Sequence, residues 1–139
     1  KKIVIKPAAS NITVNCLGDI DYTVSGKTVT VNHEVICKVG YLSGEKYEYI
    51  TAAKNADGTY SYTAPDSVTE VILFVNGDVT GDGAVDSTDY LRVKGHFVGT
   101  YTITGIALES GDVTSDGVID STDYIRIKGH FVGTFNLHA

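Results

Sequence analysis

The sequence has few cysteines and prolines, no tryptophan and no long apolar run, and each of these absences excludes a class of protein. It holds two cysteines, two prolines and no tryptophan among 139 residues. No apolar run approaches the roughly 20 residues of a membrane-spanning helix, so we expect no membrane insertion. The net charge of −6 argues against a nucleic acid partner, because contacts to phosphates need basic residues. With 42% hydrophobic and 20% charged residues, the composition predicts a folded chain rather than a disordered one.

A signal peptide and a catalytic set are also missing. The chain opens at Lys1-Lys2-Ile3, and we interpret it as part of a longer, processed protein, so the missing signal excludes nothing. His33 and Glu34 are adjacent but have no nucleophile with them in the pattern. We therefore expect no enzyme in these residues, with any catalytic domain lying upstream in the full-length protein.

Negative charge is concentrated in the second half of the chain. Residues 77–135 hold nine acids and four bases, or −5, whereas residues 1–76 hold eight acids and seven bases, or −1. Carboxylates clustered in this way repel one another, and a hard cation is the usual reason for such a cluster. Two divalent cations would bring the second half close to neutrality.

An internal repeat fills this acidic half. Residues 77–101 read GDVTGDGAVDSTDYLRVKGHFVGTY, and residues 111–135 read GDVTSDGVIDSTDYIRIKGHFVGTF. Gly77 aligns with Gly111, and the two copies are identical at all but six aligned positions. Solenoids need about three repeats or more, so two copies predict a paired module with pseudo-twofold symmetry.

Each repeat begins with the spacing of an EF-hand calcium loop. Oxygen ligands recur at alternate positions, a glycine at position 6 allows the sharp turn, and position 12 closes the shell from the following helix. Position 7 contributes only its backbone carbonyl. The sequence therefore predicts two Ca²⁺ sites. The first comprises Asp78, Thr80, Asp82, Ala84, Asp86 and Asp89, and the second comprises Asp112, Thr114, Asp116, Val118, Asp120 and Asp123.

The loops depart from the usual EF-hand at two positions. Position 12 is Asp where Glu is usual, and position 3 is Thr, whose short neutral hydroxyl we expect to lower the affinity for calcium. Asp at position 9 adds charge, directly or through water. The alternative is an acidic turn with no metal, which two matching loops disfavour.

A helix is predicted after each loop. Ser87-Thr88-Asp89 provides a cap and an early acid, and Gly99 is suited to end the helix. Apolar residues follow at helical spacing in both copies: Tyr90, Val93, Phe97 and Val98, then Tyr124, Ile127, Phe131 and Val132. No amphipathic helix is expected before either loop.

The duplicated Gly-Asp-Val-x-x-Asp-Gly-x-[Val/Ile]-Asp-Ser-Thr-Asp pattern, each copy followed by a short helix, resembles the dockerin family. The resemblance extends from Gly77 to the C-terminus. It implies a small all-α module with two Ca²⁺ that binds a cohesin module of a scaffoldin. It also implies a secreted, extracellular or cell-surface complex of an anaerobic bacterium, attached to a polysaccharide-degrading protein.

Family recognition positions 10, 11, 17 and 18, together with the repeated arginines, identify the candidate cohesin contacts. These are Ser87, Thr88, Arg92, Lys94 and Gly95, with Ser121, Thr122, Arg126, Lys128 and Gly129. Glycine at position 18 departs from the commoner basic residue and leaves the cohesin type open. Identical residues on both helices suit a module that binds in two orientations, and recent duplication is the alternative.

Residues 1–76 are predicted to form a small β-sandwich. Val-, Ile-, Thr- and Tyr-rich segments separated by turn signals indicate the strands: Ile3–Ile5, Ile12–Leu17, Tyr22–Val24, Thr28–Val39, Tyr47–Ala52, Tyr60–Thr63 and Val68–Val75. The last one runs into Asn76-Gly77-Asp78 without a linker, so we expect a β-domain (1–76) fixed on a dockerin (77–139). By position and class this resembles the X-modules that precede some dockerins.

Two features of the β-half leave alternatives open. Cys16 and Cys37 are in phase with neighbouring valines, so both face inward as a disulfide or as two buried thiols, with thiols favoured by the anaerobic setting of dockerins. Five tyrosines suit sheet faces and edges, or a sugar-binding platform: Tyr41, Tyr47, Tyr49, Tyr60 and Tyr62.

Three functions follow as hypotheses. The first is a calcium-dependent adaptor for cohesin. The second is a calcium-stabilised structural or homodimerising module. The third is a carbohydrate-binding β-module that carries a dockerin.

Overall fold

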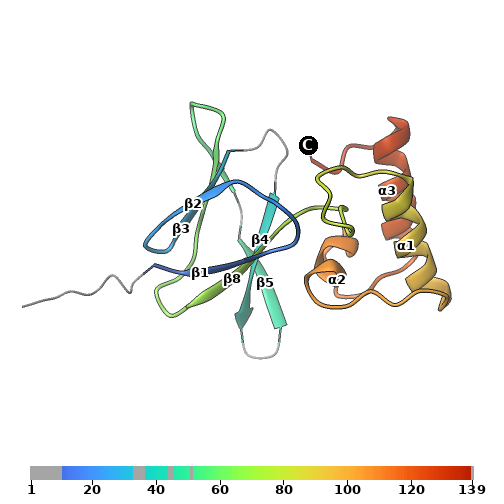
Figure 1. Cartoon of the computed structure of the whole chain (residues 1–139), viewed down its shortest axis with the longest axis horizontal. Helices are drawn as coiled ribbons and strands as arrows, with labels where there is room; N and C mark the ends of the chain where they lie inside the picture. The colour runs from blue at the N-terminus through green and yellow to red at the C-terminus, as the bar shows by residue number, and fades with distance from the viewer. Residues whose placement is uncertain (1–10, 33–36, 44–45, 51, 139) are drawn as a thin grey trace, which may run out of the picture. The chain divides into compact units, whose positions relative to one another are not determined.

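The chain divides into two compact units. The structure, a computed structural model, describes residues 11–32, 37–43, 46–50 and 52–138. The first unit contains Lys1–Asn15 and Ile20–Leu73, and the second contains Cys16–Asp19 and Phe74–Ala139. Strands precede residue 76 and helices follow it (Figure 1). Among the described helices, none has both the length and the apolar character that a membrane span requires.

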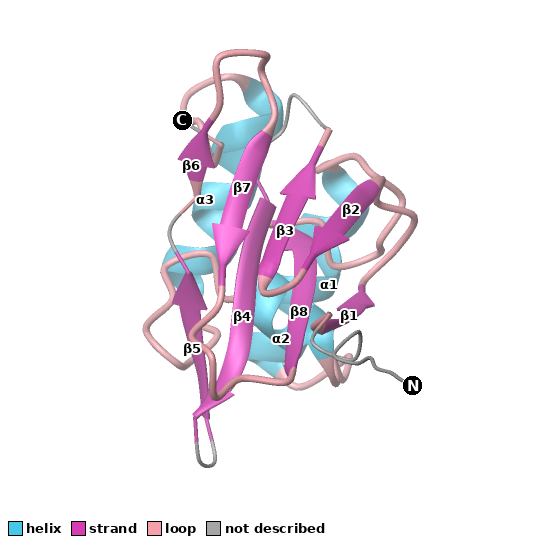
Figure 2. Cartoon of the chain, turned by 90° about the vertical axis from the view of Figure 1, so that its left-hand side faces the viewer, coloured by secondary structure: helices cyan, strands magenta, loops and turns pink. Residues whose placement is uncertain are grey.

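Within the described residues, two four-stranded sheets make up the β-rich part (Figure 2). One sheet has the order β1 (Thr13–Cys16), β8 (Glu70–Val75), β4 (Cys37–Ser43) and β5 (Lys46–Ile50). The other has the order β2 (Tyr22–Ser25), β3 (Thr28–Val31), β7 (Tyr60–Thr63) and β6 (Ala53–Lys54). The predicted β-rich first half is therefore confirmed.

The second sheet has an apolar face and a hydroxyl face, as alternation along its strands requires. In β3, Val29 and Val31 are buried, and in the antiparallel register they pair with the buried Tyr62 and Tyr60 of β7. The residues between them point the other way. Thr28 Oγ1 lies 2.9 Å from Thr63 Oγ1 on that opposite face.

The strand predicted at Val68–Val75 is present as β8, in which residues 71–75 are all buried. The segment predicted as one strand over Thr28–Val39 forms two instead. β3 ends at Val31 and β4 begins at Cys37, with residues 33–36 outside the described part. The predicted strand at Ile3–Ile5 also lies outside the described residues, as do His33 and Glu34.

Cys16 ends β1 as a free thiol. It is half-buried, and desolvation raises the pKa of its thiol, with a smaller contribution from the charge of Asp19. The side chain of Cys37 is outside the described residues.

The second unit contains three helices, α1 (Ser87–Val98), α2 (Ile106–Gly111) and α3 (Ser121–Val132). Helices α1 and α3 lie side by side (Figure 1). Phe97 at the end of α1 contacts Tyr124 at the start of α3, which shows that the two helices run in opposite directions. No amphipathic helix was expected before either loop, but the short helix α2 leads directly into the second loop.

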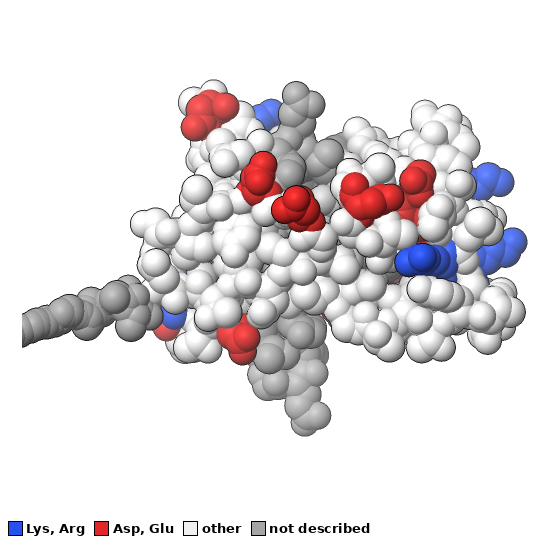
Figure 3. Space-filling view, in the orientation of Figure 1, with Lys and Arg blue, Asp and Glu red and all other residues white. Residues whose placement is uncertain are grey.

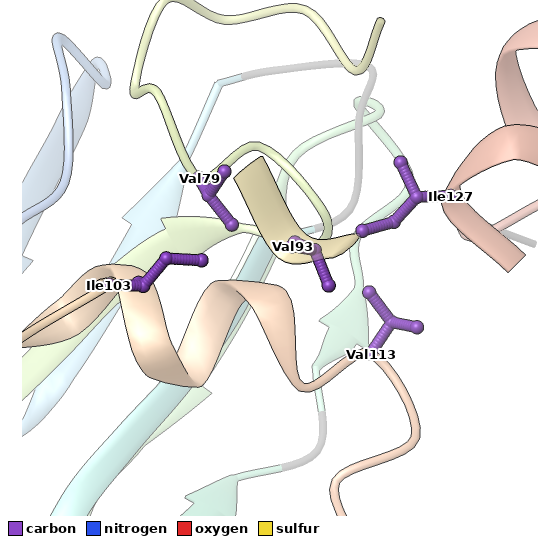
Figure 4. Close-up of a cluster of buried hydrophobic side chains, with 5 residues drawn as sticks. All are labelled: Val79, Val93, Ile103, Val113 and Ile127. Carbon is purple, nitrogen blue, oxygen red and sulfur yellow. The ribbon is translucent and has the colours of Figure 1, made fainter. Parts of the chain in front are cut away.

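A small apolar core holds this unit together (Figure 4). Val93 of α1 and Ile127 of α3 are fully buried, and Val79 and Val113 enter from position 2 of the two loops. Ile103 completes the cluster. Burying a side chain of this size contributes about 2 kcal/mol, so these five residues fix the loops against the helices.

Two of the apolar positions predicted on each helix do not enter this core. Phe97 is 47% exposed and Val98 is 55% exposed, and their counterparts Phe131 and Val132 are also exposed. The reason is that each helix packs one narrow ridge, centred on Val93 or Ile127, against the rest of the unit. Tyr90 and Tyr124 are half-buried against this core, and Phe97, Val98 and their counterparts are left exposed.

Candidate functional site

The first acidic loop is organised around the buried carboxylate of Asp78. Its Oδ1 accepts hydrogen bonds from Thr80 Oγ1 at 3.0 Å and from the Gly81 amide at 3.1 Å. Its Oδ2 accepts from the Gly83 amide at 2.8 Å. Gly83 has a φ of 89°, a conformation that favours glycine. The predicted turn at position 6 therefore curls the loop around its first ligand.

The second loop repeats this arrangement. Asp112 Oδ1 accepts from Thr114 Oγ1 at 3.2 Å and from the Asp116 amide at 3.3 Å, and its Oδ2 accepts from the Gly117 amide at 2.8 Å. The backbone differs at position 4, where Ser115 occupies a φ of 59° and Gly81 of the first loop occupies a φ of 75°.

A fully buried carboxylate from each helix closes each loop. Asp89 of α1 accepts from the Thr80 amide at 3.1 Å and from the Asp86 amide at 2.8 Å. Asp123 of α3 accepts from the Thr114 and Asp120 amides at 3.2 and 2.9 Å. The shorter Asp at position 12 thus reaches the loop and is anchored there at both oxygens.

The predicted ligands at position 9 have a local role as well. Asp86 and Asp120 are the N-cap residues of α1 and α3, and each accepts a hydrogen bond from the amide two residues later at 3.0 Å. The cap was predicted in Ser87-Thr88-Asp89 and lies one residue earlier, because Asp86 already holds the extended cap conformation. Ser87 and Thr88 then begin the helix and are exposed.

Burial and backbone hydrogen bonds shift the pKa values of several loop acids in opposite directions. Desolvation raises the pKa of Asp89 from 3.8 to about 6, against the lowering effect of its backbone hydrogen bonds. Desolvation likewise raises the pKa of Asp78, Asp112 and Asp123. The exposed Asp82 and Asp116 have lowered pKa values, chiefly because each accepts a backbone hydrogen bond.

Each loop holds a group of acids that could bind a metal ion. In each, three carboxylates offer oxygens that lie within 4.8 Å of one another: Asp78, Asp82 and Asp89 in the first, and Asp112, Asp116 and Asp123 in the second. All these donors are hard oxygens, the type that Ca²⁺ prefers. A divalent cation between them would offset the cost of burying like charges together.

The predicted recognition residues lie on the helices that follow the loops. Ser87, Thr88 and Thr122 are exposed and Ser121 is half-buried. Lys94 and Lys128 are exposed, and Arg92 and Arg126 stack on Tyr101 and Phe135 with Cζ 5.4 and 5.2 Å from the ring centroids. Basic side chains gather on one side of this unit (Figure 3).

The repeated glycines and histidines have packing roles. Gly95 and Gly129 are buried, and a Cβ on either would come within 2.9 or 2.8 Å of the Cβ of Tyr101 or Phe135. The Nδ1 atoms of His96 and His130 accept hydrogen bonds from the amides of Ile103 and Leu137, at 3.0 and 3.1 Å. Internal structure therefore accounts for part of the repeated sequence without a partner.

Sequence reasoning missed exposed apolar residues on the helix surface. Leu91 is 62% exposed and Ile125 is 59% exposed. They occupy equivalent positions of the two repeats, where the change from Leu to Ile keeps a large apolar side chain. A large apolar residue at the same position of both repeats, outside the spacing of the helical core, was the signal in the sequence that could have identified these exposed residues.

Two of the tyrosines proposed for a sugar platform are unsuitable. Tyr60 and Tyr62 are buried, at 8% and 1% exposure, so neither ring can stack on a sugar. Tyr49 is half-buried, with Lys38 Nζ 5.3 Å from its ring centroid. The side chains of Tyr41 and Tyr47 lie outside the described residues.

Comparison with known protein families supports the resemblance seen in the repeats. Residues 76–131 match the family model of the dockerin type I domain. No curated protein matches the chain. A dockerin domain is a non-catalytic interaction module, and its presence implies calcium-dependent binding to cohesin modules in cellulosome-type assemblies. Dockerins occur in secreted components of these assemblies.

Proposed function

We propose that this chain is a calcium-dependent adaptor whose residues 77–139 bind a cohesin module on a scaffoldin. One observation carries the proposal: two triads of carboxylates, each closed by a fully buried aspartate, stand at the starts of two antiparallel helices. Metal binding at such a site is coupled to folding, so a cation that offsets the charge of each triad would stabilise the helix pair. The match of residues 76–131 to the dockerin family gives the partner class.

We assign the calcium ligands from the loop positions. Side-chain oxygens at positions 1, 3, 5 and 12 would bind the ion. Position 7, Ala84 or Val118, would bind it through the backbone carbonyl. Position 9, Asp86 or Asp120, would bind it directly or through a water molecule. The full set is Asp78, Thr80, Asp82, Ala84, Asp86 and Asp89, then Asp112, Thr114, Asp116, Val118, Asp120 and Asp123.

We assign the cohesin contacts to the outer surface of α1 and α3. The proposed set keeps the serine, threonine, lysine and arginine residues of both helices and adds Leu91 and Ile125, which are large, apolar and exposed. Gly95 and Gly129 serve this surface indirectly, because they allow Tyr101 and Phe135 to pack against the helices. The matching residues on the two helices support binding in two orientations related by a half-turn.

The broader role is anchoring. Residues 1–76 would form an X-module-like companion to the dockerin, which the lack of a Pro, Ser or Thr linker at Asn76-Gly77 supports. The whole protein would then be a secreted component, carrying a polysaccharide-degrading domain upstream, in an extracellular or cell-surface complex of an anaerobic bacterium.

The test is a binding panel of cohesin modules, measured by calorimetry with calcium and with a chelator. We expect at least one cohesin to bind in calcium and none in chelator. The double variant Asp78→Ala, Asp112→Ala should lose binding, whereas Asp66→Ala, which removes an exposed acid outside the loops, should bind like the wild type. Binding that persists in chelator, or no binding across the panel, contradicts the proposal.

The two-orientation part has its own test. Replacing Ser87 and Thr88 by alanine leaves the other helix competent, so affinity should fall by only about twofold, or about 0.4 kcal/mol. Replacing Ser121 and Thr122 as well should cost several kcal/mol, because both orientations lose their central contacts. If either double variant alone abolishes binding, one helix is the only recognition element.

A further inference from the structure

A buried serine just before the second repeat is hydrogen-bonded to the entry of the first acidic loop. Ser110, in the short helix α2, is fully buried. Its Oγ donates a hydrogen bond to the backbone carbonyl of Val75 at 2.9 Å, and its own carbonyl accepts one from the amide of Gly77 at 2.9 Å. Ser110 precedes Asp112, the first predicted ligand of the second loop. One residue therefore connects the segments that lead into the two loops.

Both hydrogen bonds act on the turn that sets the position of Asp78. The amide of Asp78 donates to the Val75 carbonyl at 3.0 Å, which closes the turn. Gly77 lies inside this turn with a φ of 90°, in the left-handed region that favours glycine. Ser110 thus holds the carbonyl at the start of the turn and the amide directly before the first ligand.

The second loop is entered in a different way. The amide of Asp112 donates to the carbonyl of Leu108 at 3.1 Å, so α2 itself positions the first ligand of this loop. The hydroxyl of Ser110 takes no part in that bond, because it donates to Val75. The first repeat has Asn76 at the position equivalent to Ser110, so the two loop entries are built from different residues.

Two other residues from the later part of the chain contact the same region. A Cβ on the buried Gly111 would lie 3.2 Å from Cγ1 of Val79, at position 2 of the first loop. Nε2 of His138 lies 2.9 Å from the carbonyl oxygen of Asn76, inside the turn. The entry of the first loop is therefore fixed from outside its own repeat, and Ser110 provides two of the hydrogen bonds.

We infer that Ser110 is a positioning residue for the first calcium site, although it belongs to the segment that leads into the second. The inference rests on the calcium binding in the proposed function. Removing the hydroxyl deprives the buried Val75 carbonyl of a donor, so the turn before Asp78 loses a fixed point. Calcium would then have to order this turn on binding, and a site that is less preorganised binds more weakly. The second loop keeps the α2 hydrogen bond that positions Asp112.

The experiment measures each loop separately in the Ser110→Ala variant. Asp112→Ala leaves only the first loop to bind calcium, and Asp78→Ala leaves only the second. In calorimetric calcium titrations, adding Ser110→Ala should weaken the first loop about fivefold and the second by no more than about twofold, as loss of one buried hydrogen bond would. The matched control is Ser61→Ala, which removes a hydroxyl bonded to Asn55 in the β-rich part and should leave both loops unchanged.

Amide signals of the intact chain give a second measurement, which does not require the single-loop variants to fold. The amides of Gly83 and Gly117 each donate to the first ligand of their loop at 2.8 Å, so their NMR shifts follow calcium binding loop by loop. In Ser110→Ala the midpoint for Gly83 should move to about fivefold higher free calcium, and the midpoint for Gly117 should move less.

The comparison of the two loops decides the result. An equal loss at both would show that Ser110 only stabilises the unit, and a larger loss at the second loop or no change at either would also overturn the inference, while calcium binding stands. If the wild type binds no calcium in either measurement, the calcium sites of the proposed function fail together with this inference.

Discussion

The two repeats of the helical unit have nearly the same local structure in different surroundings. The caps agree closely: Asp86 and Asp120 have φ of −140° and −141°, and Gly99 and Gly133 have φ of 90° and 89°. The surroundings differ, since β8 leads toward the first loop and α2 into the second. Ile103 after the first repeat is buried, whereas Leu137 after the second is half-buried. Local geometry thus follows the repeated sequence, and burial follows the position of each repeat in the unit.

The largest expected effect comes from breaking one calcium loop at a time. Asp78→Ala and Asp112→Ala should each reduce the calcium stoichiometry from two to one, because each removes the residue that organises its loop. Each should also lose about 3–4 kcal/mol of calcium-dependent stability at saturating metal. Calorimetric titration and thermal melting with and without chelator measure both effects. A stoichiometry of zero in either variant would show that the two loops bind calcium only together.

The pH dependence of the metal-free protein should come first from the first loop. The pKa of Asp89 is raised from 3.8 to about 6 in the folded state, so the folded state binds its proton more tightly than the unfolded state does. The contribution of Asp89 to stability is then greatest below about pH 4 and falls, by about 2 kcal/mol after allowance for solvent screening, as pH rises through 6. Urea unfolding of metal-stripped protein from pH 4 to 7 measures this. Asp89→Asn should flatten the profile, and an unchanged profile would assign the effect to other acids.

The glycine pair tests whether the repeats are equally packed. Gly95→Ala and Gly129→Ala would each place a Cβ under 3.0 Å from Tyr101 or Phe135. We expect each to destabilise the unit by about 1–3 kcal/mol, despite the better helix propensity of alanine. Lys94→Ala, one position away and exposed, is the control and should change stability by less than about 0.5 kcal/mol. If the glycine variants are as stable as the wild type, the segments that follow the two helices can move aside to make room for the added Cβ at little cost in stability.

The smallest expected effect concerns position 4 of the loops. Ser115 has a φ of 59° and Gly81 a φ of 75°, a region that costs a residue with a Cβ about 1 kcal/mol. Ser115→Gly should therefore stabilise the unit by about 0.5 kcal/mol once the extra freedom of the unfolded chain is deducted. Gly81→Ser should destabilise it by about 1 kcal/mol, because a Cβ there would also lie 3.1 Å from the backbone nitrogen of Gly18. Chemical denaturation in calcium measures both changes in stability. Changes of the opposite sign would show that the positive φ at position 4 does not determine them.

Much of the helical unit could be predicted because its information is local. Loop spacing, the glycine at position 6 and the C-terminal Gly99 act over short stretches of chain, so loops, helices and candidate ligands were accessible from the sequence. The short α2 was not, because the segment between Gly105 and Asp112 is too brief to carry a clear periodicity. Its Gly111 is buried, and a Cβ there would lie 3.2 Å from Val79, so tertiary packing decides that helix.

The β-rich part depended more on long-range pairing. The run Thr28–Val39 is rich in β-type residues, yet β3 ends at Val31 and β4 begins at Cys37 in the other sheet. Composition predicts that such residues form strands, but the partner strands decide which sheet each segment joins. Burial of Tyr60 and Tyr62, rather than display of their rings, follows from the same pairing with Val29 and Val31.

By itself, the sequence determined the duplicated calcium loops, the helices that follow them and the resemblance to dockerins. These depend on ligand type and spacing within a single repeat, which no distant contact can alter. The tertiary structure decided which repeated residues remain outside. It buries Gly95 and Gly129, exposes Leu91, Phe97 and their copies, and brings Lys94 and Lys128 over one ring. The physical reason is that the antiparallel packing of α1 and α3, set by burial of Val93 and Ile127, determines the surface that a partner meets.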